Sequence, residues 1–254
     1  MPVSRKEAPP DAFGRAAREY ELGRPVWPEE LLDRVIVELR LRREMAVLDL
    51  GAGTGKLTRD LMPRFDRVVA VEPDEEMLTV LQEVVPGAEA RRGSAEAIPL
   101  GDGEVDAVFS AEAFHWFASD ESIAEIVRVL RPRGALAILW NIGIEYDSMG
   151  DEAEAVIQEM FERGGEPGIG RVLSGGWRAP LERGPFEELR EEVVERDVVN
   201  SRDEWIANML SVSSIAHQPE EDRLAFAERM RELIPAGRRV RRRFRTVAYW
   251  TRLA

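Results

Sequence analysis

Short apolar runs alternate with segments of helical period along the first 140 residues of the chain. The apolar runs are bounded by turn residues and have the length of buried strands. We predict strands at residues 45–50, 68–72, 88–93, 105–111 and 135–140. Between them, apolar residues recur every three or four positions, which indicates amphipathic helices at residues 57–62, 74–84 and 120–130. Strands that alternate with helices predict an α/β fold with a mostly parallel sheet.

The pattern is weaker at both ends of the chain. At the N-terminal end, Pro25 and Pro28 separate two predicted helices at residues 12–20 and 29–41. The glycine-rich residues 164–176 are predicted to form a loop. Further helices are predicted at residues 151–163, 202–215 and 219–233, and further strands at residues 192–199 and 241–253. No internal repeat or low-complexity tract is visible, so we expect a single domain over residues 1–254.

A glycine cluster follows the first strand, and a helix follows the glycines. Gly51, Gly53 and Gly55 leave room for backbone N–H groups to approach a ligand, because no Cβ stands in the way. The cluster fails the P-loop pattern, since Leu57 follows the Gly-Lys pair and the first required glycine is missing. It also departs from the dinucleotide-binding pattern, because its third glycine comes one residue early.

Acidic residues stand at the ends of the first two strands. An acid at Asp49 would repel a pyrophosphate, but it suits a ligand that carries an ammonium group. Glu72 lies about 20 residues beyond the turn, where ribose hydroxyls are usually captured. Together the two acids describe a ligand with a ribose and a cationic amino acid but no phosphate. S-adenosylmethionine fits that description.

The same segments resemble the motifs of class I S-adenosylmethionine-dependent methyltransferases. Four motifs occur in the order of the family, at residues 47–55, 69–74, 93–100 and 128–134. The resemblance implies a Rossmann-like, seven-stranded, mostly parallel sheet with the last strand antiparallel, helices on both faces, and a helical insertion over the cleft. Within the domain we expect a helical cap at residues 1–43, a cofactor-binding core at 44–145, substrate-side helices and strand six at 146–240, and a closing strand at 241–254.

The resemblance also implies the cofactor, S-adenosyl-L-methionine, which leaves S-adenosyl-L-homocysteine as product. In the family the glycine turn and the strand-end acids hold the cofactor, and the turn after the third strand receives the adenine. The expected cofactor-binding residues are Tyr20, Arg24, Asp49, Gly51, Ala52, Gly53, Glu72, Pro73, Met77, Ser94, Ala95, Glu96, Ala111 and Phe114.

The segment before the first motif matches a pattern of a methyltransferase subgroup. Tyr20, Arg24, Pro25, Trp27 and Pro28 fit Tyr-x-x-x-Arg-Pro-x-[Tyr/Trp]-Pro. In small-molecule methyltransferases of that subgroup this segment closes over the cofactor. Arg24 is then expected to pair with the cofactor carboxylate, because a guanidinium matches a carboxylate with two hydrogen bonds. The alternative is a helix pair that only packs on the sheet.

A stretch rich in aromatic residues, at residues 112–117, follows the fourth strand, at the sheet edge where open α/β sheets bind ligands. His115 is our candidate catalytic residue, as a general base, although a histidine among aromatic residues is also a common packing residue. The candidate substrate-contacting residues are Trp27, His115, Trp116, Asn141, Trp205, Met209, Ser213 and His217.

The composition of the chain indicates which classes of partner to expect. The formal net charge of −13 argues against nucleic acid, despite six arginines at residues 238–245, because phosphate neutralisation dominates such binding. With no cysteine and two histidines we expect no disulfide framework and no metal site. No apolar run has the length of a membrane span or of a signal peptide, so we expect no membrane association and a cytoplasmic monomer or homodimer.

The leading hypothesis is a methyltransferase that acts on an oxygen, nitrogen or carbon nucleophile of a small molecule. The alternatives are a methyltransferase that acts on nucleic acid or protein, and a non-catalytic S-adenosylmethionine-binding protein. An NAD(P)-dependent enzyme is a further alternative, because its glycine pattern is related.

Overall fold

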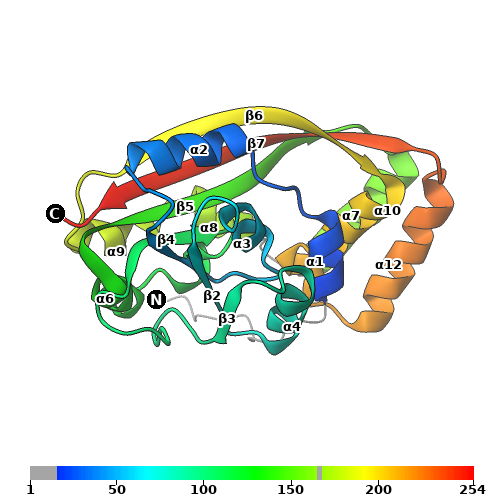
Figure 1. The fold of residues 1–254 in the computed structure, drawn as a ribbon. Helices are drawn as coiled ribbons and strands as arrows, with labels where there is room; N and C mark the ends of the chain where they lie inside the picture. The colour runs from blue at the N-terminus through cyan, green and yellow to red at the C-terminus, as the bar shows by residue number, and fades with distance from the viewer. Residues whose placement is uncertain (1–15, 165–167) are drawn as a thin grey trace, which may run out of the picture.

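A seven-stranded sheet forms the centre of the computed structural model, which describes residues 16–164 and 168–254 (Figure 1). The strands are β1 (Ala46–Leu50), β2 (Arg67–Glu72), β3 (Glu89–Arg92), β4 (Val105–Ala111), β5 (Leu130–Tyr146), β6 (Arg190–Ser201) and β7 (Arg239–Arg252). Their order across the sheet is β3-β2-β1-β4-β5-β7-β6. All paired neighbours are parallel except that β7 runs antiparallel to β5 and to β6. The predicted Rossmann-like sheet with an antiparallel last strand is therefore confirmed.

Helices cover both faces of the sheet. They are α1 (Ala17–Gly23), α2 (Glu29–Glu38), α3 (Lys56–Leu61), α4 (Glu75–Val84), α5 (Phe114–Phe117), α6 (Asp120–Val129), α7 (Asp151–Gly164), α8 (Gly168–Leu173), α9 (Arg178–Arg183), α10 (Arg202–Leu210), α11 (Ser213–Ala216) and α12 (Glu220–Leu233). None of the helices in the described ranges is long and apolar enough to cross a membrane.

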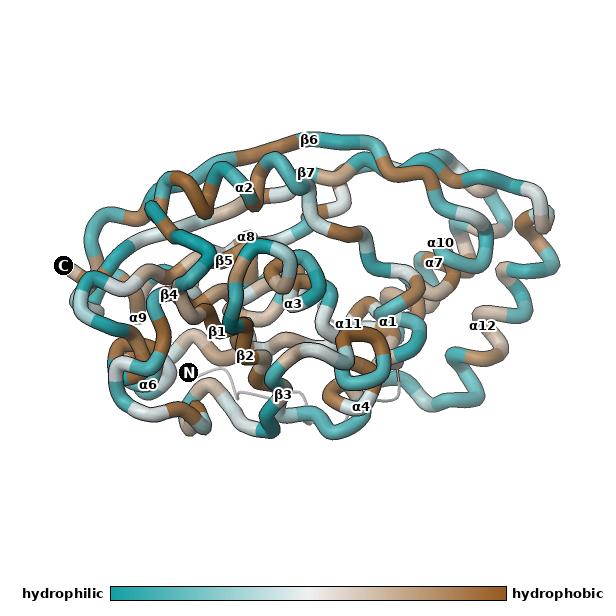
Figure 2. The backbone as a smooth tube through the Cα atoms, in the orientation of Figure 1, coloured by the Kyte–Doolittle hydropathy of each residue, from teal (hydrophilic) through white to brown (hydrophobic). Residues whose placement is uncertain are grey.

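Alternate residues of the central strands belong to two separate hydrophobic clusters. Leu48 and Val108 pack in a cluster with residues of α6 and α9. Val47 and Phe109 pack in a cluster on the other face, with residues of α2 and α3. A strand residue is therefore buried whichever way it points, which explains why these strands read as continuous apolar runs. Figure 2 shows β1 and β2 as largely hydrophobic segments.

Side-chain caps fix where two helices begin. The Asp74 carboxylate accepts hydrogen bonds from the backbone N–H groups of Glu76 and Met77, both at 3.0 Å, and α4 starts at the next residue. Ser119 and Ser122 form a reciprocal capping box at the start of α6. Such caps satisfy N–H groups that have no partner inside the helix.

The strands β5, β6 and β7 form a long ribbon that carries a helical unit at its far end (Figure 1). The helices α7, α10 and α12 bury a third hydrophobic cluster, which includes Ile157, Trp205, Phe226 and Met230. The helix α1 packs against α10. There Gly23 is needed, because a Cβ at this position would lie 2.1 Å from the backbone nitrogen of Asn208.

Several predicted boundaries in the second half of the chain are wrong. Residues 168–173, predicted as loop, form α8, because Ser213 accepts a hydrogen bond from the Gly168 N–H and Trp177 donates one to the Val172 carbonyl. The helix α9 was not predicted at all. The strand β5 runs on to Tyr146 because β7 pairs with it from Ala135 to Tyr146. The predicted helix 202–215 is divided into α10 and α11. Residues 12–15 of the first predicted helix lie outside the described residues.

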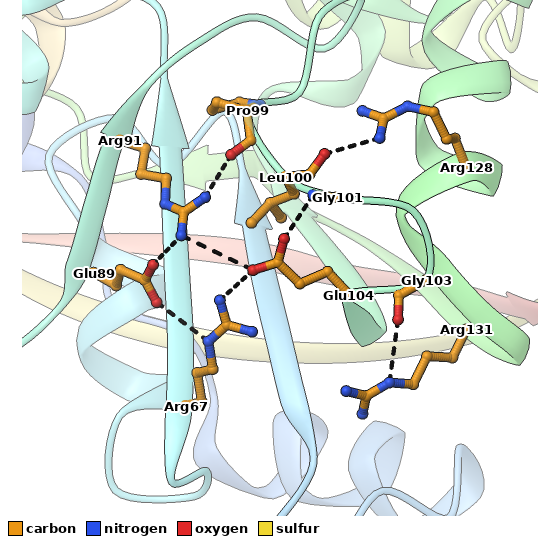
Figure 3. A network of polar contacts seen from close by, with 10 residues as sticks. All are labelled: Arg67, Glu89, Arg91, Pro99, Leu100, Gly101, Gly103, Glu104, Arg128 and Arg131. Atoms are coloured by element: carbon orange, nitrogen blue, oxygen red, sulfur yellow. Dashed lines mark hydrogen bonds and ion pairs between the residues drawn. The ribbon is translucent and has the colours of Figure 1, made fainter.

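A polar network fixes the loop between β3 and β4 (Figure 3). Arg67, at the start of β2, pairs with Glu89 at 3.2 Å and also with Glu104. The Glu104 carboxylate accepts the Gly101 N–H at 2.6 Å, and Arg128 donates to the Leu100 carbonyl at 2.8 Å. The network lies at the amino ends of these strands. It therefore leaves the carboxyl ends, at the opposite edge, free for a site.

Candidate active site

A cavity lies at the carboxyl ends of β1 and β4, covered by the segment that leads from α1 to α2. It is lined by Tyr20, Arg24, Pro25, Trp27, Asp49, Ala52, Lys56, Leu57, Ala111, Glu112 and Asn141. Most of these residues belong to the sets expected to contact the cofactor or the substrate. Two polar residues among them, Lys56 and Glu112, were not expected. The enclosed space is about 20 Å³, roughly the room one water needs.

The glycine turn has one packed side and one open side. Gly51 has a φ of 72°, and a Cβ there would lie 2.6 Å from the Cβ of Ala113. Gly53 has a φ of 56°, and a Cβ there would meet no atom within 4 Å. The Gly53 N–H donates to the Glu72 carboxylate at 2.8 Å. Other side chains would be strained at both positions, and the open side at Gly53 lets a ligand approach the backbone.

Asp49 carries a buried carboxylate oxygen that no described residue satisfies. The side chain is 1% exposed, and its Oδ2 accepts a hydrogen bond from the Thr58 hydroxyl at 2.6 Å. Its Oδ1 has no partner in residues 16–164 and 168–254. Burial raises the pKa of Asp49 to about 7. Leaving such an acceptor unpaired costs about 1–3 kcal/mol, so this oxygen is suited to a donor that a ligand brings.

Glu72 lies at the end of β2, the strand next to β1. Its carboxylate accepts the backbone N–H groups of Gly53 at 2.8 Å and Asp74 at 2.9 Å. Burial raises the pKa of Glu72 to about 7, and the negative charges of Asp74 and Asp49 add to the shift. The ends of two neighbouring strands therefore carry acids whose negative charges are poorly solvated, which favours a cationic ligand beside them.

The segment that covers the cleft is tied to both of its sides. Glu21 of α1 accepts a hydrogen bond from the Thr54 hydroxyl at 2.7 Å and pairs with Arg59, both close to the glycine turn. Arg24 donates from Nε and Nη2 to the hydroxyl and the carbonyl of Ser211, each at 3.0 Å. Its guanidinium also lies 5.3 Å from the centre of the Tyr20 ring.

Glu112 is a site residue that was not expected from the sequence. It follows β4 with a φ of 58°, and its carboxylate accepts the backbone N–H of Asn141 at 2.6 Å. β5 continues beyond the end of β4, so this N–H has no strand partner on that side. Burial raises the pKa of Glu112, while the Arg24 guanidinium opposes the rise. The signal that could have found it is an acid at a strand end, as at Asp49.

His115 presents a hydrogen-bond donor to its surroundings. Its Nδ1 accepts the indole N–H of Trp140 at 3.0 Å, so the proton of the neutral ring is on Nε2. Burial lowers the pKa of His115 to about 3, and the charges of Arg171 and Arg24 contribute. At neutral pH neither ring nitrogen is a free acceptor, and this arrangement favours a donor over a general base.

The aromatic neighbours of His115 have different surroundings. Trp116 lies under the guanidinium of Arg171, at 4.9 Å from the ring centre. Phe114 is fully buried and packs edge-on against Phe117 at 5.3 Å, in the core rather than at the cavity.

Several expected cofactor residues lie outside the cavity lining. Met77 is buried and packs with Ala17 and partly buried Tyr20 under α1. Ala95 is buried and Ser94 is half-buried in the turn after β3. Glu96 and Pro73 are exposed. The resemblance to the family implies that these positions lie around the adenine, and that role stays a prediction.

The four expected substrate residues of the helical unit do not meet at the cavity. Trp205 is 1% exposed, and Met209 packs beside it in the cluster of α7, α10 and α12. Ser213 accepts the Gly168 N–H at 3.0 Å, and His217 is exposed at the end of α11. Asn141, in contrast, lines the cavity, and its Oδ1 accepts the Thr246 hydroxyl at 2.6 Å.

Comparisons with known proteins agree with this fold. The family described as "Methyltransferase domain" matches residues 48–138. An uncharacterized methyltransferase of Schizosaccharomyces pombe is 33% identical over 226 residues, 85% of this chain and 84% of that protein. An uncharacterized methyltransferase of Mycobacterium tuberculosis is 44% identical over 164 residues, and the match spans 63% of the length of that relative and 63% of this chain.

A solved structure has the same architecture. The structure of a candidate type II methyltransferase from Anaeromyxobacter dehalogenans is 25% identical and superimposes with a TM-score of 0.63, covering 91% of this chain and 98% of that one. Sequence and fold agree, and the chain belongs to the class I S-adenosylmethionine-dependent methyltransferase family.

Proposed function

We propose that the cleft binds S-adenosyl-L-methionine and that the protein transfers its methyl group to an oxygen, nitrogen or carbon atom of a small molecule, with S-adenosyl-L-homocysteine as product. The observation that carries the proposal is the unpaired Oδ1 of Asp49, buried beside the glycine turn. It suits the ammonium group of the cofactor, and it would repel the pyrophosphate of NAD(P).

The other residues of the cleft fit the same ligand. We propose that Glu72, at the end of the neighbouring strand, accepts the ribose hydroxyls. Gly53 leaves an open side at the turn. Tyr20, Arg24 and Trp27 cover the cleft, and a ligand as large as a nucleoside requires this segment to move outward, because the cavity measures about 20 Å³. We propose that the segment closes again over the bound cofactor.

When bound, S-adenosyl-L-methionine supplies a methyl group that is already activated on a sulfonium. The chain's own residues then have to bind and align the two reactants. We propose that the Nε2–H of His115 donates a hydrogen bond to the acceptor, since Trp140 occupies Nδ1. Glu112 holds the Asn141 backbone in place and keeps that strand position fixed beside the cleft.

A small acceptor is favoured over a nucleic acid. The net charge of −13 opposes contact with a phosphate backbone. Three arginines of β7 that face solvent are paired with acids: Arg241 with Asp147, and Arg243 and Arg245 with Glu195. Their charges are therefore partly neutralised on this face.

Calorimetry tests the proposal. Asp49→Asn keeps an acceptor for Thr58 but removes the charge, and we expect it to weaken S-adenosylmethionine binding by about 1–3 kcal/mol. Asp102→Asn is the matched control, because Asp102 is an exposed acid in the loop before β4, paired with Arg128. Equal affinity of the wild type and Asp49→Asn for the cofactor would remove Asp49 from the site.

A further inference from the structure

Arg242 is the buried member of an arginine-rich strand. Its neighbours on β7 are exposed and paired: Arg241 with Asp147 at 3.3 Å, and Arg243 with Glu195 at 3.1 Å. Arg242 points to the other face and is 8% exposed, and its side chain makes no ion pair or hydrogen bond within the part of the chain that the structure describes. Its Nη1 is buried without a partner there.

An unpaired buried guanidinium is unfavourable for the folded protein. Burial lowers the pKa of Arg242 to about 9, and the positive charge of Arg24 adds to the shift. A guanidinium nevertheless stays charged near neutral pH and buries its charge at a large desolvation cost. Arg242 stacks on Phe244, with its Cζ 4.5 Å from the ring centre, but this contact replaces none of the lost hydrogen bonds. The geometry calls for an anion that the described chain does not supply.

The guanidinium lies beside the cleft, on the side away from Asp49. A Cβ built on Gly143 would lie 3.8 Å from Nη2 of Arg242, and Gly143 follows the cavity-lining Asn141 by two residues on β5. Thr246, on the same face of β7 as Arg242, donates its hydroxyl hydrogen to Asn141. A ligand group at Arg242 would therefore extend along β5 from the cavity.

The charges around this place favour an anion. The positive charges of Arg24 and Arg171 both lower the pKa of His115, and the charge of Arg24 also lowers the pKa of Arg242. The acids Glu112, after β4, and Glu154, on α7, have other partners: Glu112 accepts the Asn141 N–H, and Glu154 accepts the Tyr146 hydroxyl at 2.6 Å.

We propose that Arg242 binds a carboxylate of the methyl acceptor, so that the acceptor is a small organic anion. The inference rests on the proposed function, and it names the acceptor class for the same site. A guanidinium binds a carboxylate or a phosphate with two parallel hydrogen bonds. Arg24 already donates to Ser211, and Arg171 lies over Trp116, so Arg242 offers the unpaired guanidinium at this place. One guanidinium matches the single negative charge of a carboxylate better than the two charges of a phosphate dianion.

The test compares carboxylates with neutral and phosphate analogues. The protein is first saturated with S-adenosylhomocysteine. Three groups of compounds are then added at constant ionic strength: the carboxylates acetate, succinate and phenylacetate; the matching amides acetamide, succinamide and phenylacetamide; and phenyl phosphate. Binding is followed by thermal shift and ligand-observed NMR. We expect carboxylates to bind and amides not to bind. Arg242→Met should weaken carboxylate binding roughly 10- to 100-fold, and Arg242→Lys less. The exposed control Arg245→Gln should leave it unchanged.

Two further readouts separate a binding role from a structural one. Unliganded Arg242→Met should melt at the same temperature as the wild type or higher, because an uncompensated charge has been removed. S-adenosylhomocysteine binding should be the same in both proteins. A lower melting temperature for Arg242→Met, equal binding of amides and carboxylates, preference for phenyl phosphate, or no carboxylate binding at all would overturn the inference. Failure of the wild type to bind S-adenosylhomocysteine would instead overturn the proposed function.

Discussion

The two halves of the sheet differ in shape and in the charges that they bring to the cleft. The strands β1 to β4 are 4–7 residues long, and acids lie at the ends of β1 and β2. The strands β5 to β7 are 12–17 residues long and carry the buried Arg242 and a helical unit with its own core. A cleft with acids on one side and an arginine on the other is suited to two reactants of opposite charge. We infer a cationic donor on the acidic side and an anionic acceptor on the other.

On the acidic side, Asp49 should make the free energy of unfolding depend on pH. The pKa of Asp49 is raised to about 7 in the folded protein, above its ordinary value of 3.8, so the folded state binds the proton more tightly. The stabilisation from this proton is present below about pH 4 and is lost as the pH rises through about 7. Relative to Asp49→Asn, the wild type should lose roughly 2–4 kcal/mol of unfolding free energy between about pH 4 and about pH 8. Urea denaturation across this range checks the difference, and parallel curves for both proteins would contradict it.

Cofactor affinity should separate the two halves directly. Glu72→Gln should weaken S-adenosylmethionine binding by about 1–3 kcal/mol, because charged hydrogen bonds are lost. Arg242→Met, in the other half, should leave that affinity unchanged. Calorimetric titration of both variants under the same conditions measures the contrast. Equal losses in the two variants would mean that one continuous site serves both reactants.

His115 follows β4 and accepts a hydrogen bond from Trp140 of β5, so it lies between the two halves. Its role as a donor can be tested by comparing a variant that lacks an N–H with one that supplies an N–H. His115→Ala should reduce kcat roughly 5- to 30-fold, since one hydrogen bond worth about 1–2 kcal/mol is lost. His115→Gln can place an N–H near the position of Nε2, and it should retain more of the rate. Steady-state kinetics with an acceptor found among the carboxylates above supplies the comparison. A variant rate that does not depend on the presence of an N–H would remove the donor role.

The smallest expected effect concerns the segment that covers the cleft. Glu21→Gln should lower the free energy of unfolding by about 0.5–1 kcal/mol, because the side chain bonds Thr54 and Arg59 at a partly exposed position. Thermal denaturation measures the change, and Glu83→Gln, an exposed acid paired with Arg18, is the control. A loss no larger than that of the control would show that this contact does not hold α1 on the glycine turn.

The same comparison explains what the sequence could predict. In the first half the signals are local: the strand predicted at residues 105–111 coincides with β4, and Asp49 and Glu72 stand at strand ends beside a recognisable turn. In the second half the structure depends on contacts between distant segments. The helix α8 is held by a hydrogen bond from Gly168 to Ser213, which no local pattern indicates.

The site residues that were not predicted also depend on contacts between distant segments. Glu112 binds the Asn141 N–H because β5 continues beyond the end of β4 and leaves this N–H without a strand partner. That position depends on the register between two strands. Arg242 is one of the six arginines at residues 238–245, and only the pairing of β7 with β5 and β6 shows that it faces the interior. Trp205 was expected at the substrate, but its apolar side chain packs in a core of the helical unit.

The central claim is that the acids at the ends of β1 and β2 select a phosphate-free, cationic nucleoside. Side-by-side calorimetric titration of the wild-type protein with S-adenosylmethionine and with NADH at about pH 8, above the raised pKa values of Asp49 and Glu72, tests it most directly. We predict saturable binding of S-adenosylmethionine and no measurable binding of NADH. Binding of NADH as tight as that of S-adenosylmethionine, or tighter, would contradict the account.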